Sequence, residues 1–295
     1  MAATNMKAVK LRIKSVQNTM QITKAMQLVA ASKLRKAKEK AEKSKPYYET
    51  LHQTLTDIAG GNTDFQSQYT KSGKNEKWLY VVIAGDRGLA GGYNANLFKK
   101  VEEETAGKDY EVLPIGKKAV DYFQHKGVSI LTEDFAEAAE IGASDCFEIS
   151  RLLCEQYRKG AYGHISLCFT RFVSMMTQTP EVTAMLPLSD FAGECQNADA
   201  TAEDVAGKAR NLILYEPDSE TVFDTIVPDY LAGILYTGVN VSVASELAAR
   251  RTAMEAATDN AEEMIDTLSL NYNRARQASI TQEITEIVAG AEEAG

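Results

Sequence analysis

The sequence of 295 residues predicts an α/β protein, in which long N- and C-terminal helices form an antiparallel coiled coil and a central segment forms a Rossmann-like parallel sheet. Three observations support this prediction. Apolar residues recur at coiled-coil spacing near the N-terminus and again toward the C-terminus, and strand-like and helix-like segments alternate between these regions. We therefore divide the chain into an N-terminal coiled-coil helix (1–60), a Rossmann-like domain (75–190), a loop and base segment (191–217) and a C-terminal coiled-coil helix (218–295).

The first 60 residues predict one long helix. Its apolar residues follow the a/d spacing of a coiled coil, at Met6, Val9, Ile13, Val16 and Met20, and then at Ile22, Met26, Val29, Leu34, Ala37 and Ala41 with a shifted phase. Pro46 lacks a backbone donor, so we expect a kink or a joint there, and Gly60 with Gly61 should end the helix. A helix of this length must project and needs a partner along its length.

Charge is unevenly distributed along the chain. The formal net charge is −9, yet residues 1–46 hold twelve Lys or Arg and only two acids. The lysines from Lys33 to Lys45 raise the hypothesis of nucleic-acid binding. This run lacks interleaved aromatic residues and the rest of the chain is strongly acidic, so a solvated helix face is the preferred interpretation and no nucleic-acid partner is expected.

The central segment alternates between strand-like and helix-like stretches, which favours a parallel sheet with helices on both faces. The predicted strands are Trp78–Ala84, Glu111–Ile115, Val128–Leu131, Ile165–Phe172 and Val182–Leu188. The predicted helices are Asn94–Thr105, Lys117–Lys126 and Ala143–Lys159.

A glycine-rich loop, residues 85–92, follows the first predicted strand, where α/β folds often bind phosphates. It matches neither GxGxxG nor GxxxxGK[ST], and no acidic residue suited to a ribose stands at Pro114–Gly116. A nucleotide-binding α/β enzyme with helical extensions therefore stays the alternative function. The preferred interpretation is a turn that lets strand and helix approach closely, with Arg87 as a surface charge or partner contact.

The sequence offers little for catalysis or metal binding. Its four cysteines form no CxxC pair and its three histidines lie far apart, so we expect no metal, no cofactor and no catalytic residue. No apolar run approaches the roughly 18 residues that span a bilayer, so no transmembrane segment is expected. The beginning of the chain lacks the apolar core of a signal peptide and fits a bacterial protein better than an imported precursor.

From Asp218 onward the sequence predicts a second long helix. Its seam runs through Leu247, Met254, Ala261, Ile265, Leu268, Tyr272, Ala275 and Ser279. With a globular domain between them, the two long helices must run antiparallel. A further apolar stripe near the end lies beyond the expected reach of the N-terminal helix, at Ile280, Ile284, Ile287, Val288 and Ala291. Such a stripe predicts a partner that encloses it.

Several stretches, in order along the chain, resemble the gamma subunit family of F-type ATP synthases. They are Ile22–Ala37 (ITKAMQLVAASKLRKA), Gly85–Gly91 (GDRGLAG), Leu214–Asp218 (LYEPD), Ala256–Asn260 (AATDN) and Ala275–Ala291 (ARQASITQEITEIVAGA). The resemblance covers essentially the whole chain. Two positions depart from it: Ala90 stands where many relatives carry Cys, and Cys195 is alone in its loop, so thiol switching of the chloroplast type is not expected.

The resemblance implies a non-catalytic central rotor shaft of a proton-translocating ATP synthase, peripheral on the cytoplasmic face of a bacterial cell membrane. The coiled coil would turn inside a ring of alpha and beta subunits, where ATP is made. The Rossmann-like domain would stand on the membrane c-ring and bind the epsilon subunit, with Tyr215 and Glu216 at its base. Rotation of the shaft would couple ion flow to ATP synthesis or hydrolysis.

The same resemblance implies roles for individual residues of the coiled coil. Arg276, Gln277 and Thr281 resemble the family's catch, which hydrogen-bonds a beta-subunit loop. Met26 and Lys33 fall in the region that faces a beta-subunit lever, where the lysine would meet acidic residues.

Overall fold

The computed structural model describes residues 2–60, 65–71, 73, 75–189, 191 and 215–293. These fall into two compact units. The first, which we call the domain unit, comprises residues 33–249, and the second, the tip unit, comprises residues 1–32 with 250–295. Both long helices, α1 (Ala2–Gly60) and α7 (Ser219–Glu293), contribute to both units.

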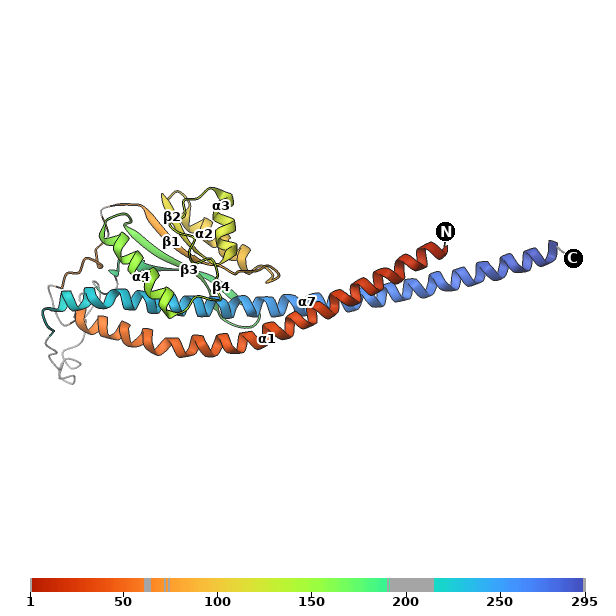
Figure 1. The fold of residues 1–295 in the computed structure, drawn as a ribbon, viewed down its shortest axis with the longest axis horizontal. Helices are drawn as coiled ribbons and strands as arrows, with labels where there is room; N and C mark the ends of the chain where they lie inside the picture. Colours follow the sequence, from red (N-terminus) through yellow and green to blue (C-terminus); the bar gives the residue numbers. More distant parts are fainter. Residues whose placement is uncertain are drawn as a thin grey trace, which may run out of the picture. The chain divides into compact units, whose positions relative to one another are not determined.

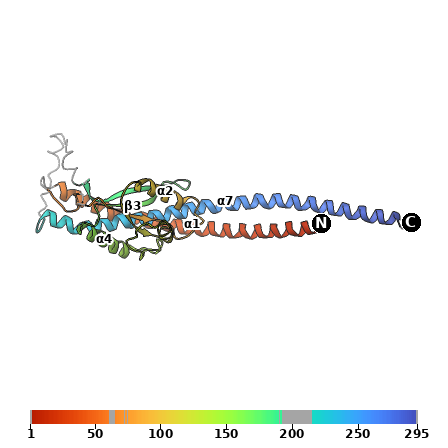
Figure 2. The same ribbon diagram turned by 90° about the horizontal axis from the view of Figure 1, so that it is seen from above.

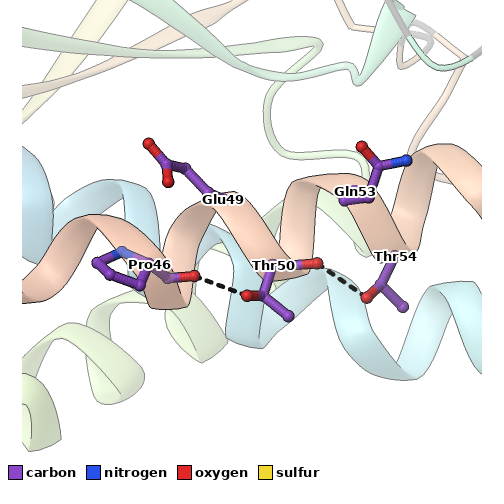
Figure 3. A pocket seen from close by; sticks show the side chains of 5 residues that line it. All are labelled: Pro46, Glu49, Thr50, Gln53 and Thr54. Atoms are coloured by element: carbon purple, nitrogen blue, oxygen red, sulfur yellow. Dashed lines mark hydrogen bonds between the residues drawn. The ribbon is translucent and has the colours of Figure 1, made fainter.

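Helix α1 continues through Pro46, so the expected joint at this residue is wrong. Proline removes one backbone donor, and the carbonyl that loses its partner is that of Glu42, on the exposed side of the helix where water can satisfy it. Two hydroxyls add hydrogen bonds just beyond: Thr50 Oγ1 donates to the Pro46 carbonyl and Thr54 Oγ1 to the Thr50 carbonyl, each at 2.8 Å (Figure 3). The shallow hollow in Figure 3 is lined by ordinary surface residues of this helix.

The sheet of the domain unit has the strand order β2-β1-β3-β4. Strands β1 (Trp78–Ile83), β2 (Tyr110–Ile115) and β3 (His164–Phe172) run parallel, as the sequence predicts. Strand β4 (Gln178–Leu186) pairs antiparallel with β3, so the sheet is mostly rather than wholly parallel.

One predicted strand, Val128–Leu131, is wrong. Only an isolated parallel bridge between Val112 and Ile130 is present there. The segment turns immediately afterwards, because Thr132 and Asp134 exchange hydrogen bonds that close a local turn.

Helices cover both faces of the sheet (Figure 1). Alternate residues of β1 enter two separate cores. Tyr80 and Val82 pack with α2 (Tyr93–Thr105) and α3 (Lys117–Lys126). Leu79, Val81 and Ile83 pack on the other face with α4 (Ala143–Arg158) and with parts of α1 and α7. Gly127, at φ 67°, ends α3 in the left-handed conformation that glycine tolerates best.

The long helices pair antiparallel within each unit (Figure 2). In the domain unit, Tyr48 stacks on Tyr230 with ring centroids 5.5 Å apart, whereas Leu34 packs with Leu247. Residue numbers therefore rise along α7 as they fall along α1. In the tip unit, the hydroxyls of Thr23 and Thr258 lie 2.8 Å apart.

The seam of α1 keeps a single heptad phase, which corrects the shifted phase expected from the sequence. Thr23 and Ala30 are buried, whereas Ile22 and Val29 are exposed. The sequence pattern is misleading here because the true seam positions carry polar or small side chains. Thr23 can occupy the seam because its hydroxyl is hydrogen-bonded both to Thr258 and to the Met20 carbonyl.

Helix α7 contains an 18-residue window with a mean hydropathy of 1.2, apolar enough by composition to cross a bilayer. Of that window, 72% is buried inside the protein. The apolar residues of α7 supply the core of the domain unit, including Phe223, Leu231 and Leu235, which favours a core helix over a membrane span.

Candidate functional site

The last turns of α7 extend past the end of α1. Thr23 lies beside Thr258, and counting one residue of α7 for each residue of α1 places Ala2, where α1 begins, beside Ser279. Ser279 is buried with 7% of its surface exposed, and it is the last buried residue among those whose side chains are described. The predicted seam therefore ends where its partner helix ends, and α7 continues to Glu293.

An exposed apolar face begins directly after Ser279. The exposed fractions are 47% for Ile280, 57% for Ile284, 71% for Ile287 and 54% for Val288. Successive helical residues turn by about 100°, so these four side chains share one face, which points away from the Ser279 seam. The side chain of Ala291, predicted to join the stripe, lies outside the described set.

Three polar residues flank this apolar face. Arg276 and Gln277 are exposed one turn before Ile280, and Thr281 is exposed next to it. The Thr281 hydroxyl donates to the Gln277 carbonyl at 3.0 Å, so towards a partner it can act as an acceptor. Arg276 offers guanidinium hydrogen-bond donors, and the Gln277 amide offers both a donor and an acceptor. Together with Thr281, these residues can bind a polar loop of another protein.

The N-terminal candidates do not form one site with these residues. Met26 is half-buried in the tip unit, whereas Lys33 is exposed at the beginning of the domain unit. Sequence reasoning missed a second exposed apolar stripe in the tip unit, formed by Leu11, Ile22 and Val29. Their spacing of eleven and seven residues, close to whole helical turns, is the signal that could have revealed it.

Tyr215 and Glu216 lie just before α7. Tyr215 is half-buried against the main core of the domain unit and Glu216 is exposed. Asp218 caps the helix, because its carboxylate accepts a hydrogen bond from the Thr221 amide at 2.7 Å. The rest of the predicted loop and base segment, including Cys195, lies outside the described residues except for Phe191 and Pro217.

The glycine-rich loop forms a tight structural turn with acidic surroundings. The Asp86 carboxylate accepts hydrogen bonds from the amides of Ala138 and Ala139 at 2.8 and 3.1 Å. The carboxylate of buried Glu246, on α7, lies against Gly85. A phosphate at this loop would meet two carboxyl groups, so the geometry disfavours the alternative of a nucleotide site. Arg87 is exposed.

Reactive groups are scarce in the described part of the chain. Within it, no three His, Cys, Asp or Glu residues gather as a metal site would require. Cys146, Cys154 and Cys168 are free and buried. Burial raises the pKa of the Cys146 thiol to about 12 and that of Cys154 to about 11, which suppresses the reactive thiolate.

Comparison with known proteins gives matches along the whole chain. The family model described as ATP synthase matches residues 5–293. The "ATP synthase gamma chain" of Ruminococcus albus is 46% identical over 289 residues, 96% of each chain. A gamma chain of Acetobacterium woodii, named sodium ion specific, is 39% identical over 98% of this chain and 99% of its own.

A chain of the mitochondrial ATP synthase of Euglena gracilis, in a structure titled OSCP/F1/c-ring, has a similar fold. Its TM-score is 0.68, with 98% of this chain and 94% of that chain covered and 19% sequence identity. At this identity the likeness concerns the fold, namely long terminal helices with a mostly parallel sheet between them.

Proposed function

The chain belongs to the ATP synthase gamma chain family, and from this membership we propose that it is the rotor shaft that couples rotation of a membrane c-ring to ATP synthesis. It is a non-catalytic subunit, with ATP made on the beta subunits. The observation that carries the proposal is the uncovered end of α7. There an apolar face and three polar side chains stand on a helix that no other part of the described chain covers.

The apolar face suits a shaft that turns in a sleeve. Ile280, Ile284 and Ile287 have no directional bonding groups, so they can slide past an apolar ring of the alpha and beta subunits at many angles. Burying each of these side chains contributes roughly 1.5–3 kcal/mol, enough to hold the shaft in place.

The polar residues suit contacts made at particular angles. We propose that Arg276, Gln277 and Thr281 engage a loop of one beta subunit at a time, because hydrogen bonds depend on direction. Met26 and Lys33 are proposed to face a beta-subunit lever, with the exposed ammonium of Lys33 meeting acidic side chains.

The domain unit is proposed to meet the membrane ring and the epsilon subunit. Tyr215 and Glu216 lie where the chain enters α7, and exposed Glu216 is free to contact polar c-ring loops. The complex would lie on the cytoplasmic face of a bacterial membrane, with this chain peripheral to the bilayer. We propose that the chain divides functionally into residues 1–60, 75–190, 191–217 and 218–295.

We propose the proton as the coupling ion. The relative that is 46% identical carries no ion designation in its name, whereas the Acetobacterium relative is named sodium ion specific. Ion choice is made by groups in the membrane ring, which this chain only contacts. The test is ATP-driven ion uptake by vesicles that hold the complete complex: proton uptake without sodium supports the proposal, and a strict sodium requirement overturns it.

The shaft function is tested by tagging the chain in its host and purifying its complex. We expect alpha, beta and epsilon subunits to co-purify, and a bead on this chain to rotate during ATP hydrolysis when the catalytic ring is fixed to glass. The isolated chain should neither hydrolyse ATP nor bind it tightly in calorimetry. Clear turnover by the pure chain, or a complex that hydrolyses ATP with a stationary bead, contradicts the proposal.

A further inference from the structure

Helix α7 completes the end of strand β3 at Thr170. The pairing of β1 with β3 stops at Cys168, so the buried Thr170 lies beyond the last β1 partner. Its partner position in β4 is Pro180, which has no N–H to donate. The Thr170 amide donates to Ser242 Oγ at 3.2 Å, and the Thr170 carbonyl accepts from Ser245 Oγ at 2.9 Å.

A third hydrogen bond joins the same turn of α7 to helix α2. The Tyr93 hydroxyl donates to the backbone carbonyl of Ser242 at 3.1 Å. Burial raises the pKa of Tyr93, which keeps the phenol protonated and able to donate. Tyr93, Ser242 and Ser245 are all buried, so each of these bonds forms away from competing water and leaving it unmade would be costly.

Steric fit holds the helix on either side of this turn. A Cβ on Gly238 would lie 2.9 Å from Leu167 Cδ2, so the α7 backbone lies directly on the sheet there. One turn beyond Ser242, a Cβ on Gly85 would lie 2.7 Å from Glu246 Oε1. The two glycines provide the space that this close approach needs.

Apolar packing alone leaves a helix some freedom to turn about its own axis, whereas hydrogen bonds fix direction. We propose that Ser242, Ser245 and Glu246 form a clamp that fixes the rotational setting of α7 on the α/β sheet and carries torque between them. The inference rests on the proposed shaft function, since torque matters only in a rotating subunit. The three are positioning residues, and none needs to touch a nucleotide.

The clamp itself is tested by amide exchange on the full chain labelled with 15N-threonine. In the Ser242→Ala/Ser245→Ala variant we expect the Thr170 amide to exchange about tenfold faster, as loss of one net hydrogen bond allows. The Thr183 amide in β4 serves as the internal reference. Thr225→Ala is the matched control, because this exposed α7 hydroxyl donates to the Thr221 carbonyl of its own helix. Unchanged exchange at Thr170 overturns the clamp.

The torque role is tested in the assembled complex, with the catalytic ring fixed to glass and a bead attached to α3. During pauses between steps, the double variant should show a wider angular distribution than the Thr225→Ala control. If the double variant does not assemble, the single variant Ser242→Ala is compared with the Thr225→Ala control instead. Equal widths with normal rotation overturn the torque role and leave the shaft function standing. Absence of rotation with the unaltered chain overturns the shaft function, and the torque role falls with it.

Discussion

Glu246 of α7 and Gly85 in the loop just after β1 fit together so closely that a single methyl group on the glycine would lie 2.7 Å from the Glu246 carboxylate. This contact ties the long helix to the loop that in other α/β proteins receives phosphate. A side chain at this position would force the Glu246 carboxylate to move, so the glycine fits its neighbour within the same chain and the loop is a structural joint.

Replacing Gly85 by alanine should destabilise the domain unit. We expect a loss of about 1–3 kcal/mol in the free energy of unfolding, because the buried carboxyl group must shift. Urea unfolding of the full chain measures it. Gly88→Ala is the matched control, since a Cβ there meets nothing within 4 Å. The cost of Gly85→Ala should shrink in a Glu246→Ala background, and strict additivity of the two substitutions would contradict the contact.

The sequence predicts most of this fold because its signals are local. Apolar runs mark β1 and β3, and heptad spacing marks both long helices. The antiparallel beginning of β4, from Gln178 to Glu181, carries no apolar run because it lies at the open edge of the sheet, so its polar residues resemble a loop.

The exposed end of α7 could also largely be predicted from the sequence. The predicted seam ends at Ser279, which is the last buried residue described, and the isoleucine stripe after it is exposed. The heptad phase of the α1 seam could not be predicted from the sequence. Thr23 occupies a seam position because its hydroxyl is hydrogen-bonded to that of Thr258, 235 residues away. The clamp at Thr170 likewise depends on distant segments that no short motif connects.

Glu111 should stabilise the sheet only while it is ionised. Its carboxylate accepts hydrogen bonds from Tyr162 at 2.6 Å, Ser129 at 2.8 Å and Lys77 at 3.0 Å. Burial acts to raise its pKa, but the bonds from Tyr162, Ser129 and Lys77 together outweigh burial and hold the pKa below its usual value. The contribution is therefore present above the ordinary glutamate pKa and is lost as the pH falls through the lowered one.

Glu111→Gln should cost about 1–3 kcal/mol at pH 7, because an amide cannot accept all three bonds equally. The measurement is urea unfolding at pH 7 and again at acidic pH, where the difference from the unaltered chain should narrow. Glu137→Gln is the control, since that pair with Lys117 is exposed and contributes little. Equal losses for the two variants would contradict the role of the network.

His164 should weaken the domain unit as the pH falls. Its ring stacks on Trp78 with centroids 4.2 Å apart, and Lys108 Nζ lies 4.0 Å from the same tryptophan ring. Burial, followed by the charge of Lys108, lowers the His164 pKa below its ordinary value. The unfolded chain then binds a proton more readily, so the stabilisation is complete above the ordinary histidine pKa and declines as the pH drops toward the lowered one.

The measurement is urea unfolding followed by fluorescence of Trp78, the single tryptophan, between about pH 7.5 and 5, a range that brackets the ordinary histidine pKa. The unaltered chain should lose stability relative to His164→Gln as the pH falls. His125→Gln, at an exposed position, is the control and should follow the unaltered chain. A constant difference between the His164→Gln variant and the unaltered chain at all pH values would exclude this role for His164.

The exposed isoleucines should make the isolated chain self-associate. Ile284→Lys/Ile287→Lys removes two of the four large apolar side chains of this face, each contributing roughly 1.5–3 kcal/mol when buried. We expect more monomer in analytical ultracentrifugation with unchanged helical circular dichroism. Thr285→Lys adds charge in the same turn without removing apolar surface, and it should improve solubility less. Equal gains from both changes would mean that charge rather than the apolar face controls association.

The polar residues beside that face should matter for coupling and not for folding. Arg276 and Gln277 are exposed, so Arg276→Ala and Gln277→Ala should leave the unfolding free energy within about 0.5 kcal/mol of the unaltered chain. In the assembled complex, loss of a hydrogen bond to a beta-subunit loop should slow ATP synthesis several-fold, up to about tenfold for one such bond.

Gln282→Ala is the matched control. Gln282 lies five residues after Gln277, nearly one and a half turns, so its exposed side chain points to the other side of α7. ATP synthesis driven by an imposed ion gradient in vesicles measures the effect. If Gln277→Ala and Gln282→Ala synthesise ATP at the same rate, the catch does not lie on this face of the helix.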